Sequence, residues 1–108
     1  MNFQEAAARF ERSESGTDAF KLLYKDAFEL MRSDMANAGL YFVIGSAAQS
    51  YVRRYEDQGV SGEFADYAKS VLHKFNTRIV EALAAEPATR LAILGEVAAE
   101  YQLHVSEF

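Results

Sequence analysis

Five consecutive large apolar residues, Leu40 to Ile44, constrain the fold of this chain more than any other feature. Successive residues of an α-helix step by about 100° around its axis, so five such residues cannot share one face. Leu40 and Ile44 would lie together, whereas Phe42 would lie on roughly the opposite side. We therefore expect this segment to be either surrounded by other helices or covered by a second protein.

Apolar residues recur with a helical period along nearly the whole chain, which predicts an all-α fold. A short first helix is marked by Phe3 and Phe10, and it ends in the polar stretch 13–17. The second helix is expected to begin with Thr17 as its N-cap. It carries a broad apolar face that extends as far as Met35.

The boundary between the second and third helices leaves two possibilities open. Asn37 and Gly39 are typical of a helix stop, because a glycine after asparagine suits the left-handed C-terminal cap. A third helix would then run over residues 40–57. Alternatively, Gly39 is a weak point within one long helix over 18–57, since an interior glycine costs only about 1 kcal/mol. We favour two helices.

The fourth helix has the clearest pattern in the chain. A break at residues 59–62 precedes it, and Ser61 is predicted to be its N-cap. Its apolar stripe is Phe64, Ala68, Val71, Leu72, Phe75, Ile79, Ala82 and Leu83. Pro87 suits the first position of a fifth helix, and the short link before it predicts that helices four and five form an antiparallel hairpin. The stripe expected for this last helix is Leu91, Leu94, Ala98, Tyr101 and Val105, with fraying near Phe108.

A chain of 108 residues suffices for one domain with a real core. The run 40–44 is the only segment prone to form a strand, and it lacks partner strands. We therefore predict that residues 1–108 form a single compact bundle of four main helices plus a short N-terminal helix.

Composition limits the classes of partner and compartment. The formal charge of −5 and the absence of any basic tract argue against direct nucleic-acid binding. The absence of cysteine fits a reducing cytoplasm. The polar N-terminal residues do not look like a signal peptide, and no apolar run is long enough to span a membrane.

No pattern of catalytic or metal-binding residues stands out. His73 and His104 are isolated from each other and from other ligand types, so neither a metal nor a cofactor is expected. Ser46 lies in a helical pattern rather than in a nucleophile turn. The small residues Gly45 to Ala48 are instead expected to let a neighbouring helix approach closely. We therefore expect that the protein is not an enzyme.

Tyrosine and arginine gather on the third helix, and tyrosine recurs on the fifth. These residue types are enriched in the hot spots of protein interfaces. A tyrosine-rich helical face is therefore a candidate contact surface, with the residues Tyr41, Phe42, Tyr51, Arg53, Arg54, Tyr55 and Tyr101. The alternative is that the tyrosines ring the core with their hydroxyl groups in solvent.

The position of Phe42 also allows two interpretations. It shares its side of the third helix with Ser46 and Arg53, as an anchor residue with a polar rim would. Alternatively, the first helix folds back and covers Phe42 with Phe3 and Phe10. We favour this intramolecular cover, because so short a chain needs its aromatic residues to build a core.

Together these features favour a non-enzymatic protein–protein interaction module: an adaptor, an assembly factor or a stoichiometric inhibitor or regulator of a larger complex. The wide apolar arc of the last helix predicts a homodimer with a two-fold interface. The alternative function is a bundle that holds a small apolar ligand between the second, third and fourth helices, lined by Phe28, Met31 and Met35.

Overall fold

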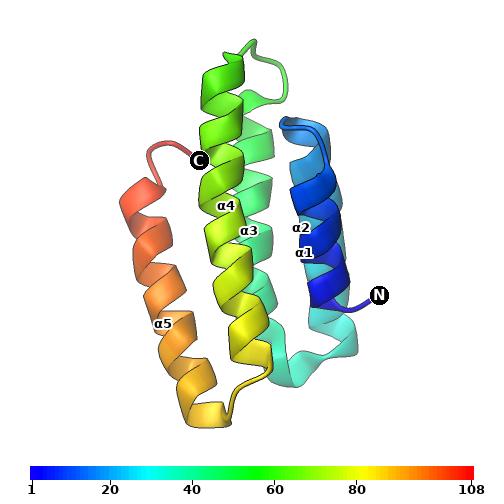
Figure 1. Cartoon of the computed structure of the whole chain (residues 1–108), viewed down its shortest axis with the longest axis vertical. Helices are drawn as coiled ribbons and strands as arrows, with labels where there is room; N and C mark the ends of the chain where they lie inside the picture. The colour runs from blue at the N-terminus through cyan, green and yellow to red at the C-terminus, as the bar shows by residue number, and fades with distance from the viewer.

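The computed structural model describes residues 1–108 as five α-helices and one 3-10 turn, without strands. The elements are α1 (Phe3–Arg12), α2 (Thr17–Ser33), the 3-10 turn η1 (Met35–Asn37), α3 (Ala38–Tyr55), α4 (Gly62–Leu83) and α5 (Pro87–His104). In Figure 1, α5 lies at one edge of the bundle beside α4, and α1 lies at the other edge in front of α2. The predicted all-α bundle of four main helices with a short N-terminal helix is confirmed, as is the α4–α5 hairpin.

The helix starts follow local capping chemistry. Asn2 caps α1 reciprocally with Glu5: each side chain accepts a hydrogen bond from the other residue's backbone N–H, at 2.9 and 3.0 Å. The predicted cap at Ser61 is confirmed, because its hydroxyl accepts from the backbone N–H of Phe64. The predicted cap at Thr17 is wrong. Gly16, with φ +140°, takes the N-cap position, and Thr17 is the first helical residue.

The second and third helices are separate, as we favoured, but the break comes earlier than Gly39. The chain leaves α2 at Asp34, whose carboxylate accepts hydrogen bonds from the side chains of Asn37 at 2.9 Å and Tyr41 at 2.7 Å. This local hydrogen bonding competes with a continuous helix. Gly39 consequently lies in the first turn of α3, and Met35 is exposed in the turn rather than on the apolar face of α2.

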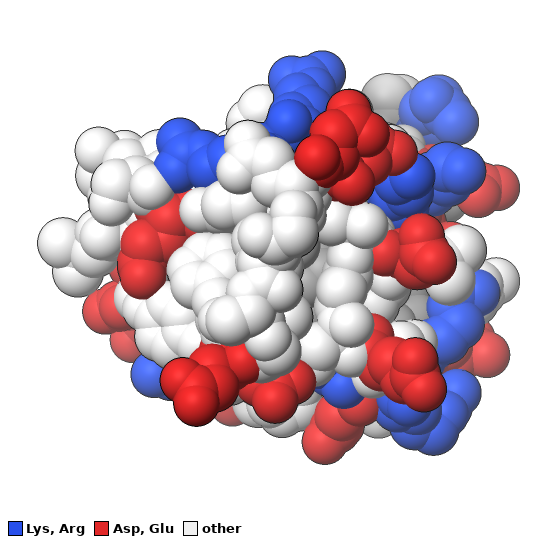
Figure 2. Space-filling view, turned by 90° about the horizontal axis from the view of Figure 1, so that it is seen from above, with Lys and Arg blue, Asp and Glu red and all other residues white.

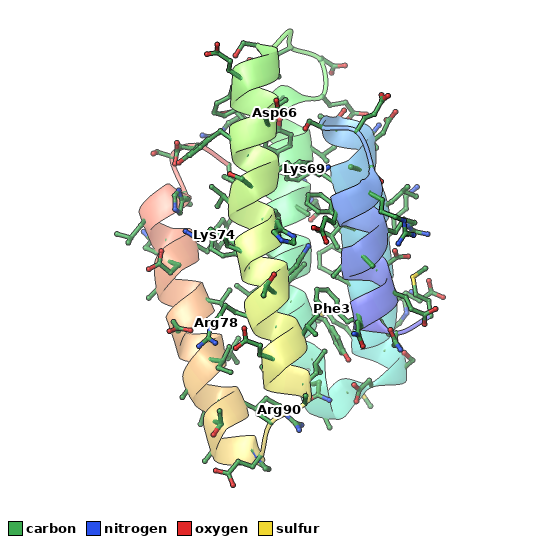
Figure 3. All side chains as sticks on the ribbon, in the orientation of Figure 1. Phe3, Asp66, Lys69, Lys74, Arg78 and Arg90 are labelled. Carbon is green, nitrogen blue, oxygen red and sulfur yellow. The ribbon has the colours of Figure 1, made fainter.

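The apolar run of α3 is enclosed by the other helices at four of its five positions. Leu40, Tyr41, Val43 and Ile44 are buried, whereas Phe42 is 55% exposed. The first helix packs elsewhere: the ring of Phe3 lies 6.0 Å from that of Tyr41, between α1 and the rest of the bundle (Figure 3). The predicted intramolecular cover of Phe42 is therefore wrong.

The predicted stripe of α4 is confirmed. Six residues of the stripe are buried: Ala68, Val71, Leu72, Phe75, Ile79 and Ala82. The two residues at its ends, Phe64 and Leu83, are partly buried. The stripe predicted for α5 is confirmed at Leu94 and Tyr101, which pack against the core, and is wrong at its other three positions. Leu91, Ala98 and Val105 are exposed, and Ile93 and Val97 face the core instead.

Hydrogen bonds from Arg90 determine which side of α5 faces the core. Its guanidinium donates to the carbonyl oxygens of Ala82 at 3.1 Å and Ala85 at 2.8 Å, and to Oδ1 of Asn37 at 2.8 Å. These bonds hold the Arg90 side of the helix against the hairpin turn. Ile93 and Val97, one and two turns further on, then face inward.

The segment after α5 turns back onto α3, and the predicted fraying near Phe108 is wrong. The Phe108 side chain is fully buried. Its carbonyl oxygen accepts a hydrogen bond from the Ser50 hydroxyl at 2.6 Å, and the carbonyl of Glu107 accepts one from the Tyr55 hydroxyl at 2.8 Å.

Candidate protein interface

The side of α5 opposite its buried residues carries no charged residue, and the exposed Glu96 and Glu100 border it on one flank. Helical steps of about 100° place the following exposed residues within an arc of about 140°, here called the outer face of α5: Ala88, Leu91, Ala92, Gly95, Ala98, Ala99, Gln102 and Leu103. Leu91 is 69% exposed and Leu103 is 75% exposed. Single exposed leucines are common, but a whole helix face without charge is a feature of contact surfaces.

The charged residues of α5 lie outside this face, with Glu96 and Glu100 on the flank toward α4. Arg90 binds the hairpin turn, as described above. Glu96 pairs with Arg78 of α4, and Glu100 lines a cleft beside α4. Figure 2 shows one end of the bundle: charged side chains of both signs crowd the margin where α1 and α2 lie, and the α5 margin carries uncharged side chains beside fewer charged ones.

Phe42 is the exposed aromatic residue of α3, the helix on which α5 packs. Leu94 packs so close to Gly39 that a Cβ at Gly39 would lie 3.2 Å from Cδ2 of Leu94. Phe42 lies about 60° from Gly39 around the axis of α3. Phe42 lies equally far, about 60°, from Gly45, which faces Phe28 of α2. The exposed ring of Phe42 therefore stands on the solvent side of α3, between the lines along which α2 and α5 pack on this helix.

Some of the predicted contact residues are buried in the structure and others are exposed. Tyr41 and Tyr51 are buried in the core, where a docked protein would not reach them. The Tyr51 ring stacks on Phe20 at 4.0 Å, and burial raises the pKa of its hydroxyl. These two tyrosines belong to the core, but the expectation that their hydroxyl groups lie in solvent is wrong. The Tyr51 hydroxyl is buried without a hydrogen-bond partner, and the Tyr41 hydroxyl donates to Asp34.

The remaining predicted contact residues lie at the surface or at its edge. Phe42, Arg53 and Arg54 are exposed, and Tyr55 and Tyr101 are half-buried. Arg54 and Tyr55 are engaged inside the protein, because both donate to carbonyl oxygens of the segment after α5. Of the predicted contact residues, Phe42 and Arg53 are therefore the ones that are both exposed and without a hydrogen bond inside the protein.

Sequence reasoning missed Leu91, which it assigned to the core. The signal was present in the charges rather than in the apolar residues. Arg90, Glu96 and Glu100 all fall outside the uncharged arc of the outer face. The positions of the charged residues therefore reveal the widest uncharged face of a helix, even where the apolar residues do not reveal which face is buried.

The two histidines and the acidic side chains do not gather into a metal site. No cluster of three or more His, Cys, Asp or Glu side chains is placed to hold a metal ion. His73 lies 3.9 Å from Glu11, and Nδ1 of His104 lies 2.8 Å from Oε1 of Glu107. None of the helices is both long enough and apolar enough to cross a membrane. Neither a model of a known protein family nor a curated protein nor a solved structure matches this chain.

Proposed function

We propose that this protein acts by contact with other proteins, as a non-enzymatic adaptor, assembly factor or stoichiometric inhibitor or regulator of a larger complex. The observation that carries this proposal is the uncharged outer face of α5, with Leu91 and Leu103 projecting from it. Apolar side chains in the centre of a contact surface supply most of its binding free energy, and charged residues are depleted there. Phe42 and Arg53 would extend the contact onto α3.

We further propose that a second copy of the chain uses the same face, in a cytoplasmic homodimer. Each copy carries a formal charge of −5, so two copies repel each other over most of their surfaces. The outer face of α5 lets them meet without opposing like charges. A two-fold interface would place the same helix of each copy in contact. The absence of cysteine fits the reducing cytoplasm.

The test of self-association uses the double variant Leu91→Glu/Leu103→Glu, which places two charges on the outer face. Leu22→Glu is the matched control, because Leu22 is an exposed leucine on α2. Sedimentation equilibrium is expected to give twice the 12.1 kDa chain mass for the wild type and the control, and the single-chain mass for the double variant. A wild type that stays at the single-chain mass at micromolar concentration rules out the homodimer.

Contact with another protein is tested with the same three forms. Each is used for affinity capture from cells of the native host, followed by mass spectrometry. A partner held by the wild type and by Leu22→Glu, but lost from the double variant, supports the proposed face. Retention of the same proteins by all three forms contradicts it.

A further inference from the structure

A cleft of about 380 Å³ runs between α4 and α5, on the inner side of α5. Its floor is apolar and consists of Val71, Phe75 and Val97, each less than a tenth exposed. Sites for small molecules in proteins typically have volumes of about 300–1,000 Å³ and combine an apolar lining with a few polar groups. The volume of this cleft lies within that range. Six of its ten lining residues are polar or charged, so its apolar part consists of the floor and the ring of Tyr67.

The walls of the cleft carry opposite charges. Lys74 and Arg78 project from α4 on the side that faces α5 (Figure 3), and Glu96 and Glu100 line the cleft from α5. The two basic and two acidic groups cancel. An anion or a cation would therefore find no net attraction, whereas a ligand with both charges finds a partner for each.

Both ends of the cleft are lined by polar groups that already have partners. At one end, Nε of Arg78 donates to Oε2 of Glu96 at 2.7 Å. At the other end, the Tyr67 hydroxyl lies 3.3 Å from Nδ1 of His104 and donates to Oε1 of Glu107 at 3.1 Å. The polar atoms at the two ends are therefore satisfied within the protein.

Lys74 and Glu100 remain between these ends without a partner. Neither side chain forms an ion pair or a hydrogen bond. Lys74 lies one helical turn from Arg78, and Glu100 lies one turn from Glu96. The two free charges therefore stand on opposite walls, one turn beyond the Arg78–Glu96 pair and above the apolar floor.

We propose that this cleft binds a free α-amino acid with an apolar side chain. The carboxylate of the ligand pairs with the ammonium group of Lys74, and its ammonium group pairs with the carboxylate of Glu100. Its side chain covers Phe75 and Val97. This site uses none of the residues of the outer face of α5, so it is independent of the proposed protein contact.

The experiment is a titration of the ¹⁵N-labelled protein, followed by NMR, with L-leucine and with L-phenylalanine. Two analogues of leucine separate its charges: 4-methylpentanoate lacks the ammonium group, and 3-methylbutylamine lacks the carboxylate. We expect saturable shifts of the amides around Val71, Phe75 and Val97. Each analogue is expected to bind at least about tenfold more weakly than leucine, because each leaves one charge of the cleft unpaired.

Two variants test the assignment of each charge. In Lys74→Met, leucine is expected to bind no better than the amine, while the affinity for the amine is unchanged. In Glu100→Gln, leucine is expected to bind no better than the carboxylate analogue. Lys25→Met, an exposed lysine on α2, is the control and should bind leucine like the wild type.

Three results would overturn the proposal. The first is the absence of saturable shifts in the cleft up to about 10 mM of either amino acid. The second is equal affinity for leucine and both analogues. The third is loss of leucine binding in Lys25→Met as large as that in Lys74→Met, which would mark a general charge effect rather than a site.

Discussion

The ring of Phe28, on α2, occupies the space that any side chain at Gly45, on α3, would need. A Cβ built on Gly45 would lie within 2.9 Å of three carbons of that ring. The neighbouring Ala47 and Ala48 are fully buried. The small residues after the apolar run therefore let α2 pack directly on the backbone of α3, as the sequence predicted.

Gly45→Ala is expected to lower the free energy of unfolding by up to about 2 kcal/mol. Overpacking costs about 1–3 kcal/mol, and the higher helix propensity of alanine offsets about 1 kcal/mol of this cost. Urea denaturation measures the change. Gly95→Ala is the control: a Cβ there meets nothing within 4 Å, so this variant should be more stable by about 0.4–1 kcal/mol. An equal gain in both variants would contradict the close contact.

Phe108→Ala is expected to destabilise the protein by about 3–5 kcal/mol, because it empties a fully buried position. The Phe108 ring lies 5.7 Å from the ring of Tyr51 and 6.4 Å from that of Phe20. Leu22→Ala, at an exposed position on α2 outside the proposed contact surface, should stay within about 0.5 kcal/mol of the wild type. Similar effects of the two variants in urea denaturation would show that Phe108 is not part of the core.

The sequence predicts α4 well because its two sides differ. Buried Leu72 and Ile79 alternate with exposed Lys74 and Thr77 at helical spacing, so one rotation of the helix buries the apolar side. The α-helical class, the break before Ser61 and the hairpin at Pro87 are predictable for the same local reasons.

The rotation of α5 could not be predicted in this way. The apolar residues of α5 are distributed around most of its circumference, so their periodicity does not indicate which face is buried. The rotation depends instead on Arg90, whose partners Ala82, Ala85 and Asn37 come together only in the folded bundle. For the same reason, composition could not distinguish buried Tyr51 from a tyrosine on a contact surface.

Asn76→Leu is expected to stabilise the protein by about 1–3 kcal/mol. Asn76 is the one polar residue among the buried side chains, and neither atom of its carboxamide has a hydrogen-bond partner. An unpaired buried polar group costs about this much, and leucine has a similar volume. Asn76→Asp should lower the stability, because it buries a charge. Destabilisation by leucine in urea denaturation would indicate that the carboxamide is hydrogen-bonded in solution.

Tyr41→Phe is expected to flatten the loss of stability at alkaline pH. Burial and the hydrogen bond to Asp34 raise the pKa of Tyr41 to about 12. The stability that this shift contributes is complete below pH 10, the ordinary pKa of tyrosine, and is lost as the pH rises to about 12. Chemical denaturation from pH 8 to 12 should show the wild type and the variant converging. A constant difference between them would contradict the assignment.

Asp34, which accepts the hydrogen bond from Tyr41, should make the stability fall at acid pH rather than at alkaline pH. Hydrogen bonds from Asn37 and from Tyr41 lower the pKa of Asp34. Its contribution to stability is therefore present above the ordinary pKa of aspartate and is lost as the pH falls through the lower, folded-state pKa. Asp34→Asn should lose less stability than the wild type between pH 5 and pH 2 in denaturation experiments, and an equal loss would contradict this role.

Phe42→Ser tests whether Phe42 belongs to the contact surface or to the core. Tyr41→Ser, at the adjacent residue, provides the matched comparison. Tyr41 is buried and Phe42 is exposed, although the two residues are adjacent. Phe42→Ser should therefore shift the melting temperature of the single chain by no more than about 4 °C, whereas Tyr41→Ser should lower it by more than about 10 °C. If Phe42 belongs to the proposed contact, Phe42→Ser weakens binding of the partner or second copy by at least about 2 kcal/mol. A melting temperature lowered as much as in Tyr41→Ser would mean that Phe42 is covered within the monomer and is not available to a partner.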